Sequence, residues 1–361
     1  MRILLVNSAI PTMFGGGEKW FVEAATGFLE RGHDVVLVGR PASRLLETAA
    51  ARGVRTVEFG FGGDFDPIAS VRAALLLRRE RPDVILTNFN KDVWLFGRGA
   101  KLFGIPLVAR HGLMAYKGKF HYKLLHRWHV DQLVVNAPTI LDHYRSLGFD
   151  VDDAKVILNG VKPAEPKPGE LRRRYDLPDG VPVVVTFGRL ALQKRLDVFV
   201  EIARRIVDAG IDARFVVMGD GAVRERLLGW IEEAGLGDRF VVPGFVEDAA
   251  AISCDADLFL LTSKNEGTPN ALLEAMAVGC CCLSTDVGAV PMVLEGELRE
   301  AMFAVDDVES MSQVAAGLLG DPGRRLYLGQ AEKTRVLERF SQEHSIARYE
   351  ELLNGRINPD C

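Results

Sequence analysis

Two glutamates separated by a helix-forming segment are the clearest chemical pattern in the sequence. Glu266 and Glu274 flank Gly-Thr-Pro-Asn-Ala-Leu-Leu, and the apolar run Leu258–Leu261 precedes them. This order predicts a buried strand, a polar loop and then a helix over Asn270–Val278. The two carboxylates would lie at different depths of one site, where one could hold sugar hydroxyls and the other a ribose. The alternative is a capped helix with an acid on its surface.

The start of that helix is expected to offer hydrogen-bond donors. Thr268 is a typical N-cap residue, and Pro269 is a typical first helical residue. The first backbone N–H groups of a helix have no partner within it, so they favour a bound anion. We therefore expect these N–H groups to point toward a ligand.

A pair of cations follows another apolar run. Gly188-Arg189-Leu190 and then Lys194 come directly after Val183–Phe187, which reads as a buried strand. An arginine fork and a lysine point charge at this spacing could clamp a diphosphate. The alternative is a pair of solvated cations.

Glycines after the first strand indicate a second place for a phosphate. Gly15-Gly16-Gly17-Glu18 follows Ile3–Asn7 and opens a predicted helix. Glycine lets the backbone approach a bulky anion closely. The spacing is not Gly-x-Gly-x-x-Gly, and no acid clearly ends the second strand for a ribose, which argues against an NAD dehydrogenase. A tight strand-to-helix turn is the alternative.

Alternating strand-like and helix-like runs must position these residues. Strand, helix, strand repeated along the chain predicts parallel sheets with helices on both faces. Proline-rich Lys162–Gly169 predicts an interdomain linker. We expect an α/β protein with two Rossmann-like, doubly wound domains over 1–165 and 170–335. A C-terminal helix over 336–361 is expected to pack back on the first domain. Ligands of such sheets bind at the carboxyl ends of the strands, which predicts a cleft between the two domains.

Composition narrows the class of protein. The chain has 361 residues, 48% hydrophobic, with a formal net charge of -5. Two cores fit this length, and the lack of a basic surplus argues against nucleic-acid binding. The run Cys280-Cys281-Cys282 lies in an apolar stretch and predicts small core residues in a reducing compartment. The N-terminus reads as a strand rather than a signal peptide, and no apolar run has membrane-spanning length. We expect a cytoplasmic protein.

Together these motifs resemble the signature of the family-4 retaining glycosyltransferases of GT-B fold. The Glu-x₇-Glu string with its following Ala-Met-Ala, the Gly188-Arg189-Leu190 segment and the Gly219-Asp220-Gly221 turn stand in the family's order. So do the Pro243-Gly244-Phe245-Val246 loop and Asn159-Gly160-Val161. The resemblance covers nearly the whole chain, with more specific motifs in the second half. It implies transfer of a sugar from a nucleotide diphosphate donor.

The resemblance also implies site residues. It assigns the transferred sugar to His111 and Glu266, the diphosphate to Arg189 and Lys194, and the ribose to Glu274. The donor-binding residues that it implies are Gly16, Gly17, Arg189, Lys194, Gly219, Phe245, Val246, Gly267, Thr268, Pro269, Asn270, Ala271, Leu272 and Glu274. His111 on its own would read as a satisfied histidine at a strand end. Two departures from the family pattern, Met292 after a proline and the charged stretch 297–303, bear on a local loop only.

Two Asp-x-Asp strings raise the question of a metal. Asp255-Ala-Asp257 lies before the strand Leu258–Leu261, and Asp64-Phe-Asp66 lies before a predicted helix at Pro67. Both have local structural explanations, the second as a helix N-cap. We therefore expect no metal and no cofactor, so that cations and the helix dipole stabilise the leaving group.

A basic-aromatic segment, Tyr116–His129, stands out in an acidic chain. It predicts contact with an anionic membrane surface beside the acceptor site, on the inner face of the membrane. An ordinary amphipathic helix is the alternative. The residues assigned to this surface are Lys117, Lys119, Phe120, Lys123, Arg127 and Trp128.

The sequence thus predicts a metal-independent hexosyltransferase. Its donor would be a nucleotide-diphosphate sugar, with UDP favoured over GDP. Its acceptor would be a glycan or lipid-linked hydroxyl in cell-envelope polysaccharide or lipopolysaccharide synthesis. A non-hydrolysing sugar-nucleotide epimerase of the same fold and a non-catalytic nucleotide-sugar-binding protein are the alternatives.

Overall fold

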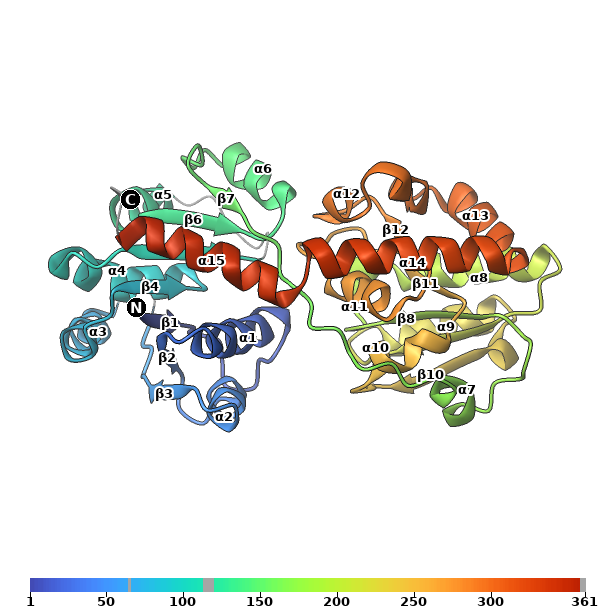
Figure 1. The fold of residues 1–361 in the computed structure, drawn as a ribbon, viewed down its shortest axis with the longest axis horizontal. Helices are drawn as coiled ribbons and strands as arrows, with labels where there is room; N and C mark the ends of the chain where they lie inside the picture. Colours follow the sequence, from blue (N-terminus) through green and yellow to red (C-terminus); the bar gives the residue numbers. More distant parts are fainter. Residues whose placement is uncertain (64–65, 113–119, 358–361) are drawn as a thin grey trace. The chain divides into compact units, whose positions relative to one another are not determined.

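The computed structural model describes residues 1–63, 66–112 and 120–357. The chain forms two compact units (Figure 1). Unit 1 comprises 1–160 and 342–361, and unit 2 comprises 161–341. The first boundary therefore lies before the proline-rich segment 162–169, and the last helix belongs to unit 1.

Unit 1 is built on a parallel sheet of seven strands in the order β3-β2-β1-β4-β5-β6-β7. Val6 of β1 is level with Val38 on one side and Thr87 on the other, so neighbouring strands end at one edge. The strands are β1 (Arg2–Val6), β2 (Asp34–Gly39), β3 (Arg55–Glu58), β4 (Val84–Thr87), β5 (Leu107–His111), β6 (Gln132–Val135) and β7 (Lys155–Val156). The residues of the central strands β1, β2, β4, β5 and β6 are nearly all buried, as expected for a sheet covered on both faces, whereas those of the edge strands β3 and β7 are half-buried or exposed.

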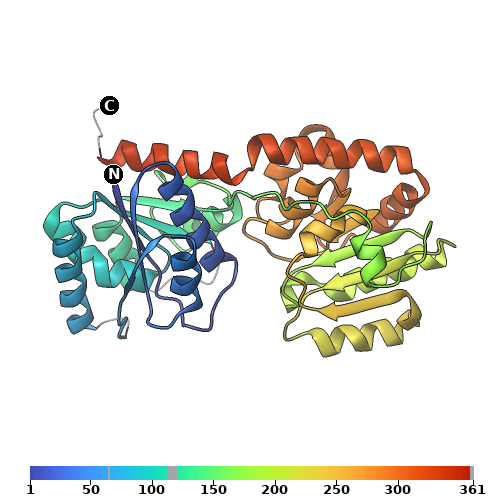
Figure 2. The ribbon, with the colours of Figure 1, turned by 60° about the horizontal axis from the view of Figure 1, so that its bottom comes forward.

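Helices cover both faces of this sheet (Figure 2). They are α1 (Gly16–Glu30), α2 (Arg44–Ala51), α3 (Pro67–Glu80), α4 (Asn90–Phe103), α5 (Phe120–His129), α6 (Pro138–Ser146) and α15 (Gln342–Ile357). On one face α1 packs against α2 and α15, while α3, α4 and α5 form a second group. Asp66 caps α3 by accepting the N–H groups of Ile68 and Ala69 at 2.9 and 3.0 Å, as the sequence predicts.

The last helix completes the core of unit 1. Ile346, Tyr349 and Leu353 of α15 are buried in one apolar cluster with α1 and the sheet. The rings of Trp20 and Tyr349 lie 4.8 Å apart between centroids. The Ser345 hydroxyl donates to the carbonyl of Leu158 at 2.8 Å. Unit 1 is therefore assembled from both ends of the chain.

Unit 2 is built on a parallel sheet of six strands in the order β10-β9-β8-β11-β12-β13. The strands are β8 (Val183–Phe187), β9 (Arg214–Met218), β10 (Phe240–Gly244), β11 (Leu258–Leu261), β12 (Cys282–Thr285) and β13 (Met302–Phe303). Phe187 pairs with Met218, which pairs with Gly244, so these three strands also end level. Both sheets therefore have the doubly wound order that the sequence predicts.

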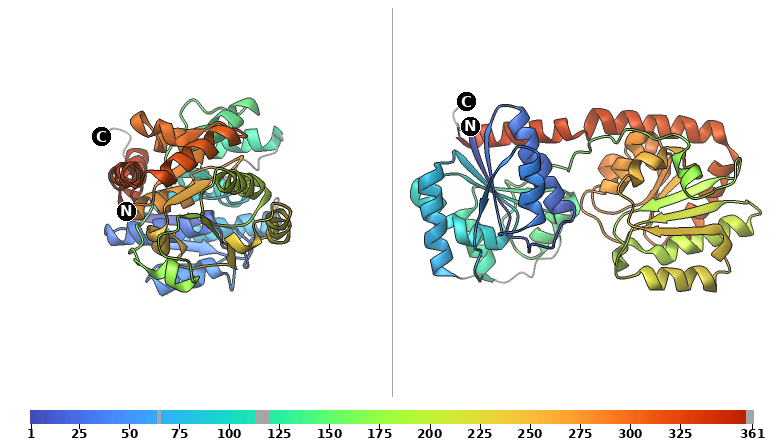
Figure 3. Two further views of the ribbon diagram at one scale, coloured as in Figure 1. Left: turned by 90° about the vertical axis from the view of Figure 1, so that its right-hand side faces the viewer. Right: turned by 90° about the horizontal axis from the view of Figure 1, so that it is seen from below.

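Helices α8 and α9 cover one face of this second sheet and α10 and α11 the other (Figure 3). The α-helices are α7 (Glu170–Arg174), α8 (Leu196–Asp208), α9 (Arg224–Glu233), α10 (Ala249–Ile252), α11 (Asn270–Val278), α12 (Val290–Val293), α13 (Val308–Gly320) and α14 (Pro322–Arg339). The 3-10 turns are η1 (Leu192–Lys194), η2 (Gly237–Arg239), η3 (Ser253–Asp255) and η4 (Gly296–Ala301). Cys280, Cys281 and Cys282 are free and buried, which confirms them as small core residues.

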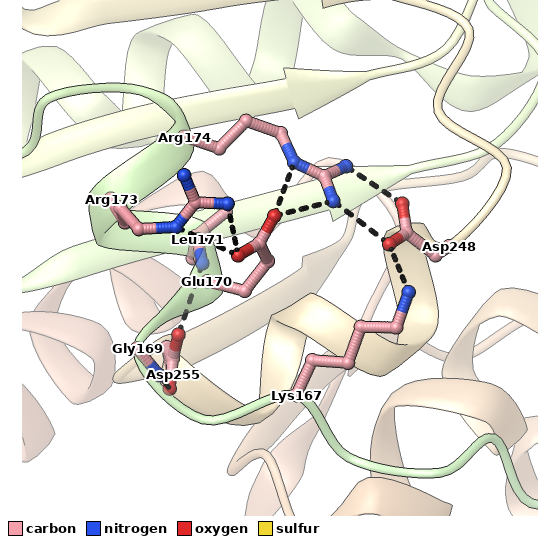
Figure 4. Close-up of polar contacts among 8 residues, drawn as sticks. All are labelled: Lys167, Gly169, Glu170, Leu171, Arg173, Arg174, Asp248 and Asp255. Carbon is pink, nitrogen blue, oxygen red and sulfur yellow. Dashed lines mark hydrogen bonds and ion pairs between the residues drawn. The ribbon is translucent and has the colours of Figure 1, made fainter.

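The segment expected to be a linker is fastened to unit 2 (Figure 4). The Lys167 ammonium lies 2.7 Å from Asp248, and Arg174 bridges Asp248 and Glu170 at 2.7 and 2.9 Å. Asp255 accepts the N–H groups of Gly169 and Leu171 at 2.7 and 3.1 Å, at the start of α7. These ion pairs fix the path of the chain more than they stabilise it, since solvent weakens ion pairs at the surface.

Candidate functional site

The residues expected to hold a donor, apart from Gly16 and Gly17 of unit 1, lie at one edge of unit 2. The strand order reverses between β8 and β11, and ligands of doubly wound sheets bind outside the carboxyl ends of strands at such a point. A small pocket opens there. Its lining includes Arg189, Lys194, Thr262 and Ser263, so the structure brings together the two cations predicted to clamp a diphosphate.

The loop after β8 is held by the loop after β9. The N–H of Leu190 donates to the carbonyl of Asp220 at 2.9 Å, and that of Gly219 donates to Gly244 at 2.7 Å. A Cβ on Gly219 would lie 1.9 Å from the Gly188 carbonyl oxygen, so only glycine fits. This packing leaves the Arg189 side chain exposed at the strand end.

Lys194 and Glu266 form an ion pair within the site. The Lys194 ammonium lies 2.7 Å from Oε1 of Glu266, and the Ser263 hydroxyl donates to the same oxygen at 2.6 Å. The two side chains are only 20% and 10% exposed, so solvent screens the pair weakly. Both of these contacts are made by Oε1, so Oε2 is the oxygen that could accept from a ligand hydroxyl. An ammonium has three donors, so Lys194 keeps two for a further anion.

The helix start differs from the prediction in one detail. Helix α11 does begin at Asn270, but Pro269 occupies the N-cap position and no side chain caps the helix. The prediction that Thr268 is the N-cap was therefore wrong. Because Pro269 has ψ of 75°, outside the helical range, the helix starts one residue later than a proline in the first helical position would require.

One side of α11 is less buried than the rest of the helix. The residues of α11 are buried except Asn270, Ala271 and Glu274, which are half-buried. Residues three and four apart lie on one helix face, so Glu274 follows the helix start on that side. Gly267, Thr268, Pro269 and Leu272 are the neighbouring predicted donor residues, and of these Leu272 is fully buried, so that only its backbone could meet a ligand.

A glycine of the next loop supports the backbone beside Glu266. Gly288 has φ of +59°, and a Cβ there would lie 2.4 Å from the carbonyl oxygens of both Glu266 and Gly267. The N–H of Ala289 donates to Gly267 at 3.1 Å. Only glycine allows this close approach.

The far side of the same edge carries an aromatic ring. Phe245 directly follows β10 and is 71% exposed, while Val246 is half-buried. An exposed aromatic side chain at a strand end is available to pack against a planar ligand group. Its position, two strands from Arg189 in the sheet order, fits the predicted contact with a base.

In unit 1, helix α1 begins at the corresponding carboxyl edge of the sheet, after β1. Gly15 is the N-cap and the predicted phosphate residues Gly16 and Gly17 form the first turn. The Glu18 carboxylate accepts the N–H of Gly15 at 2.9 Å and is buried. Both glycines have negative φ, so an open approach to the backbone, rather than left-handed backbone, is what glycine provides here.

His111 ends β5 and is buried. Its imidazole ring lies 5.3 Å from that of His126 and 5.6 Å from that of Tyr144, between centroids. Burial, with His126 and Arg110 adding to it, lowers the pKa of His111 well below its usual value. The ring is therefore neutral at pH 7, so one ring nitrogen can donate a hydrogen bond and the other can accept a hydrogen bond.

Arg110, the residue before His111, is a buried cation that no sequence motif indicated. Its guanidinium donates to Asn159 at 2.7 Å and to Asn88 at 3.5 Å, and lies 4.0 Å from the centre of the Trp20 ring. Burial lowers the pKa of Arg110, and the nearby Tyr349 and Glu18 oppose this shift. It ties β5 to α1 and to α15.

His126 is expected to contribute to the pH dependence of stability. Its Nε2 lies 2.8 Å from Oδ1 of Asn90, and burial lowers the pKa of His126 to about 4. The unfolded chain therefore binds a proton between the two pKa values that the folded chain does not, and stability falls as the pH drops below 6.5. We expect the stability of the wild type relative to His126→Gln to fall by about 2 kcal/mol between pH 7 and pH 5. Urea unfolding of both proteins at the two pH values measures this difference, and an equal difference at both would contradict the neutral buried state.

The structure shows the surroundings of one of the two Asp-x-Asp strings and the lengths of the described helices. Asp255 and Asp257 both have structural partners, since Asp257 lies 2.7 Å from Arg325 and accepts the N–H of Val183 at 2.8 Å. Within the described ranges no cluster of three or more metal-ligating side chains is found. The same ranges contain no helix that combines the length and apolarity needed to cross a bilayer. Asp64 lies outside the described residues.

The basic-aromatic segment is only partly described. Tyr116, Lys117 and Lys119 lie outside the described residues, as does the side chain of Phe120. Arg127 and Trp128 are exposed on α5. Lys123 is half-buried, with its ammonium against Gly148 after the end of α6, so it is not a fully free surface cation.

Three contributors to the site were missed from the sequence. Ser263 contacts Glu266 within one loop, whereas Gly288 and Arg110 act through contacts between segments that are distant in the chain. Ser263 follows a buried strand within a loop already predicted to be polar, which is the one local signal available. The roles of Gly288 and Arg110 depend on which strands are neighbours, so no local pattern indicates them.

Family models match both units. The model described as "Glycosyltransferase Family 4" matches residues 14–165, and that described as "Glycosyl transferases group 1" matches 181–321. The chain is 27% identical over 318 residues to 2-deoxystreptamine glucosyltransferase of Streptomyces kanamyceticus, covering 79% of this chain and 82% of the relative. It is 24% identical over 346 residues to the lipopolysaccharide core biosynthesis glycosyltransferase LpsE of Rhizobium meliloti (strain 1021), covering 95% and 96%.

Solved structures show the same fold. HepE of Anabaena in complex with UDP is similar over 98% of this chain and 100% of its own, with a TM-score of 0.85 and 17% sequence identity. A glycosyltransferase from Rickettsia africae ESF-5 is similar over 99% and 98%, with a TM-score of 0.87 and 17% identity. The two doubly wound units, the strand-end motifs and the matched models lead to one conclusion: the chain belongs to the group 1, family-4 glycosyltransferases and has the GT-B fold.

Proposed function

We propose that this glycosyltransferase moves a hexose from a nucleotide-diphosphate sugar, with UDP favoured over GDP, to a hydroxyl of a glycan or glycolipid. The observation that carries the proposal is the Lys194–Glu266 pair in the switch-point pocket beside Arg189. It combines cations for a diphosphate with a carboxylate for sugar hydroxyls. HepE, whose solved complex contains UDP, supports the choice of base.

Within unit 2 the donor would extend along the carboxyl edge of the sheet. Phe245 and Val246 would contact the base, Glu274 the ribose, and Arg189 with Lys194 the diphosphate. Gly219 and the N–H groups of 267–272 would complete the backbone contacts, because helix N-termini favour phosphate oxygens. Oε2 of Glu266 would accept a hydroxyl of the transferred sugar.

In unit 1 we assign His111 to the same sugar and Gly16 and Gly17 to phosphate. A neutral imidazole suits this role, because it can donate to a sugar oxygen without placing a full charge beside the anomeric carbon. Arg110 would act as a positioning residue through its bonds to Asn88 and Asn159.

The reaction proposed is transfer with retention at the anomeric carbon. The bond from this carbon to the diphosphate oxygen breaks, and the acceptor hydroxyl oxygen bonds to the carbon from the same face. The departing diphosphate takes the hydroxyl proton, so no side-chain nucleophile is required. Arg189, Lys194 and the α11 N-terminus stabilise the negative charge that develops on the leaving group, which is the basis for proposing metal-independent transfer.

The acceptor is proposed to belong to a cell-envelope polysaccharide or lipopolysaccharide. LpsE of Rhizobium meliloti, named for lipopolysaccharide core biosynthesis, is similar along almost the whole of both chains. The N-terminal half carries few donor motifs, so we assign acceptor recognition to it. The epimerase and binding-protein alternatives find no support among these relatives, whose names are those of transferases.

A thermal-shift panel of nucleotide sugars tests the donor. A ligand at 100 times its dissociation constant stabilises the folded protein by about 2.7 kcal/mol, so the correct donor raises Tm clearly. We expect a UDP-sugar to give the largest shift, with and without EDTA. A larger shift by GDP-sugars would contradict the base assignment, and a shift abolished by EDTA would contradict metal independence of donor binding.

A further inference from the structure

The loop that carries Lys194 ends in a strained turn. The 3-10 turn η1 spans Leu192–Lys194, and the next residue, Arg195, has φ of 47° and ψ of 51°. This left-handed conformation is unfavourable for a residue with a Cβ atom. A strained residue keeps such a conformation only where the surrounding structure holds it. Ion pairs with Asp197 and Asp306 hold the Arg195 side chain, and further contacts hold its backbone.

The loop after β11 provides these backbone contacts. The hydroxyl of Thr262 lies 2.9 Å from the carbonyl oxygen of Lys194 and 3.1 Å from that of Arg195. A hydroxyl has one proton, so the two carbonyl groups share it in a three-centre hydrogen bond. The N–H of Lys264 donates to the carbonyl of Gln193 at 2.7 Å, so the carbonyl groups of three successive residues accept from one loop. Thr262 is buried, which strengthens its hydrogen bond.

A second threonine holds the loop after β11 in turn. The hydroxyl of Thr285, at the end of β12, lies 2.6 Å from the carbonyl oxygen of Ser263 and 3.3 Å from that of Leu261. Strands β8, β11 and β12 are neighbours in the sheet of unit 2 (Figure 1). The two threonine hydroxyls therefore connect β12 to the loop after β11, and that loop to the one after β8.

We propose that Thr262 is a positioning residue for Lys194, the cation assigned to the donor diphosphate. The inference rests on that assignment, made under the proposed function. The Lys194 ammonium lies 2.7 Å from Glu266, which follows Thr262 in the same loop. One loop thus holds both the backbone and the side-chain end of the lysine. A lysine held in this way loses less conformational freedom when a diphosphate binds, so the affinity is higher.

Thr262 also lines the pocket, so direct contact between its hydroxyl and the ligand is the alternative. The single proton of this hydroxyl is already shared by two carbonyl groups, which leaves only the oxygen lone pairs for a ligand. The oxygens of an ionised diphosphate accept hydrogen bonds and do not donate them. The geometry therefore favours support of Lys194 over contact with the diphosphate.

A double-variant cycle separates these two roles. Thr262→Val keeps the shape of the side chain without the hydroxyl, and we expect it to lower the affinity for UDP about tenfold. Thr262→Ser keeps the hydroxyl and should restore an affinity within about threefold of the wild type. In a Lys194→Ala background, Thr262→Val should have little further effect, because the ammonium that it positions is absent. Calorimetric titration with UDP measures all these affinities.

Thr26→Val is the matched control, since the Thr26 hydroxyl donates to the carbonyl of Val22 at 2.8 Å within α1 of the other unit. It should bind UDP as the wild type does. Thr262→Ala removes the same hydroxyl without placing a methyl group against the two carbonyl groups, so it gives a second measurement if Thr262→Val does not fold. It should show the same dependence on Lys194.

Two results would overturn this inference alone. One is a normal loss of affinity in Lys194→Ala together with unchanged affinity in the variants that lack the Thr262 hydroxyl. The other is an equal loss on removing that hydroxyl with and without Lys194, which would mean that Thr262 acts on the ligand directly or on the fold. Unchanged UDP affinity in Lys194→Ala itself would overturn the diphosphate assignment, and the inference with it.

Discussion

Replacing Glu266 with Gln is expected to lower sugar transfer by at least about 100-fold while the affinity for the free nucleotide diphosphate stays within about threefold. The carboxylate accepts from Lys194 and Ser263 through Oε1, so we assign Oε2 to the sugar. Interactions made at the reacting centre act on the transition state more than on the bound ground state. His111→Ala is expected to behave in the same way, because its neutral ring is assigned to the same sugar.

Steady-state transfer and calorimetric nucleotide binding measured on the same preparations separate these effects. Glu274→Ala is the matched control, since it removes a carboxylate from the same helix region and should weaken the nucleotide first. If Glu266→Gln and His111→Ala both transfer sugar normally, the sugar-binding residues are assigned wrongly. If Glu274→Ala leaves nucleotide affinity unchanged, the ribose assignment is wrong.

Replacing Lys194 with Ala is expected to reduce nucleotide diphosphate affinity more than Arg189→Ala does. Each change removes a charge-assisted hydrogen bond worth about 1.5–3 kcal/mol, or at least about tenfold in affinity. Lys194 also neutralises Glu266 at 2.7 Å, so its removal leaves a poorly solvated carboxylate beside the diphosphate. The Lys194→Ala, Glu266→Gln double variant should therefore recover part of the affinity lost in Lys194→Ala.

Calorimetry on the four proteins of this cycle measures the coupling. Lys264→Ala provides a control, because Lys264 is an exposed cation in the loop that contains Glu266. No recovery in the double variant would mean that the ion pair does not govern the diphosphate site. Unchanged affinity in both Arg189→Ala and Lys194→Ala would exclude the clamp.

The fold was predictable because each element carries a local signal. Among the described residues, the strands other than the edge strands β3 and β7 coincide with short apolar runs bounded by polar residues or glycine. The helix starts at Pro67 and Pro138 follow from proline in the first turn. The doubly wound order follows from repeated strand–helix–strand units. By contrast, β13 covers only Met302–Phe303 of the apolar run 302–305, since it pairs only with the end of β12.

The site was predictable where one short segment carries it. Glu266, Arg189 and Lys194 each follow a strand closely, so parallel strands bring them to a common edge, and Glu274 lies in the helix that begins after Glu266. The Lys194–Glu266 pair itself joins residues 72 apart, and its formation depends on β8 and β11 being neighbours. Local sequence therefore indicates which residues lie at the carboxyl edge of the sheet, but it does not indicate which of them contact one another.

Backbone detail was the least predictable level. Thr268 and Pro269 have the residue types of an N-cap and a first helical residue, yet α11 begins at Asn270. Gly288 packs against the backbone at Glu266. A Cβ on residue 288 would lie 2.4 Å from the carbonyl oxygens of Glu266 and Gly267, so only glycine allows this packing. Such tertiary contacts override residue preferences that are worth only about 1 kcal/mol.

Hydrogen–deuterium exchange of the wild type with and without its nucleotide diphosphate can locate the donor. We propose that the donor binds along the carboxyl edge of the unit 2 sheet, at the switch point between β8 and β11. We expect saturating nucleotide to slow exchange in the segments 186–196, 243–247 and 262–274, which hold Arg189, Lys194, Phe245 and Glu266. The segments of α13 and α14 should be unchanged. Nucleotide binding that protects none of these three segments, or that protects unit 1 alone, would show that the donor does not bind at this edge of unit 2.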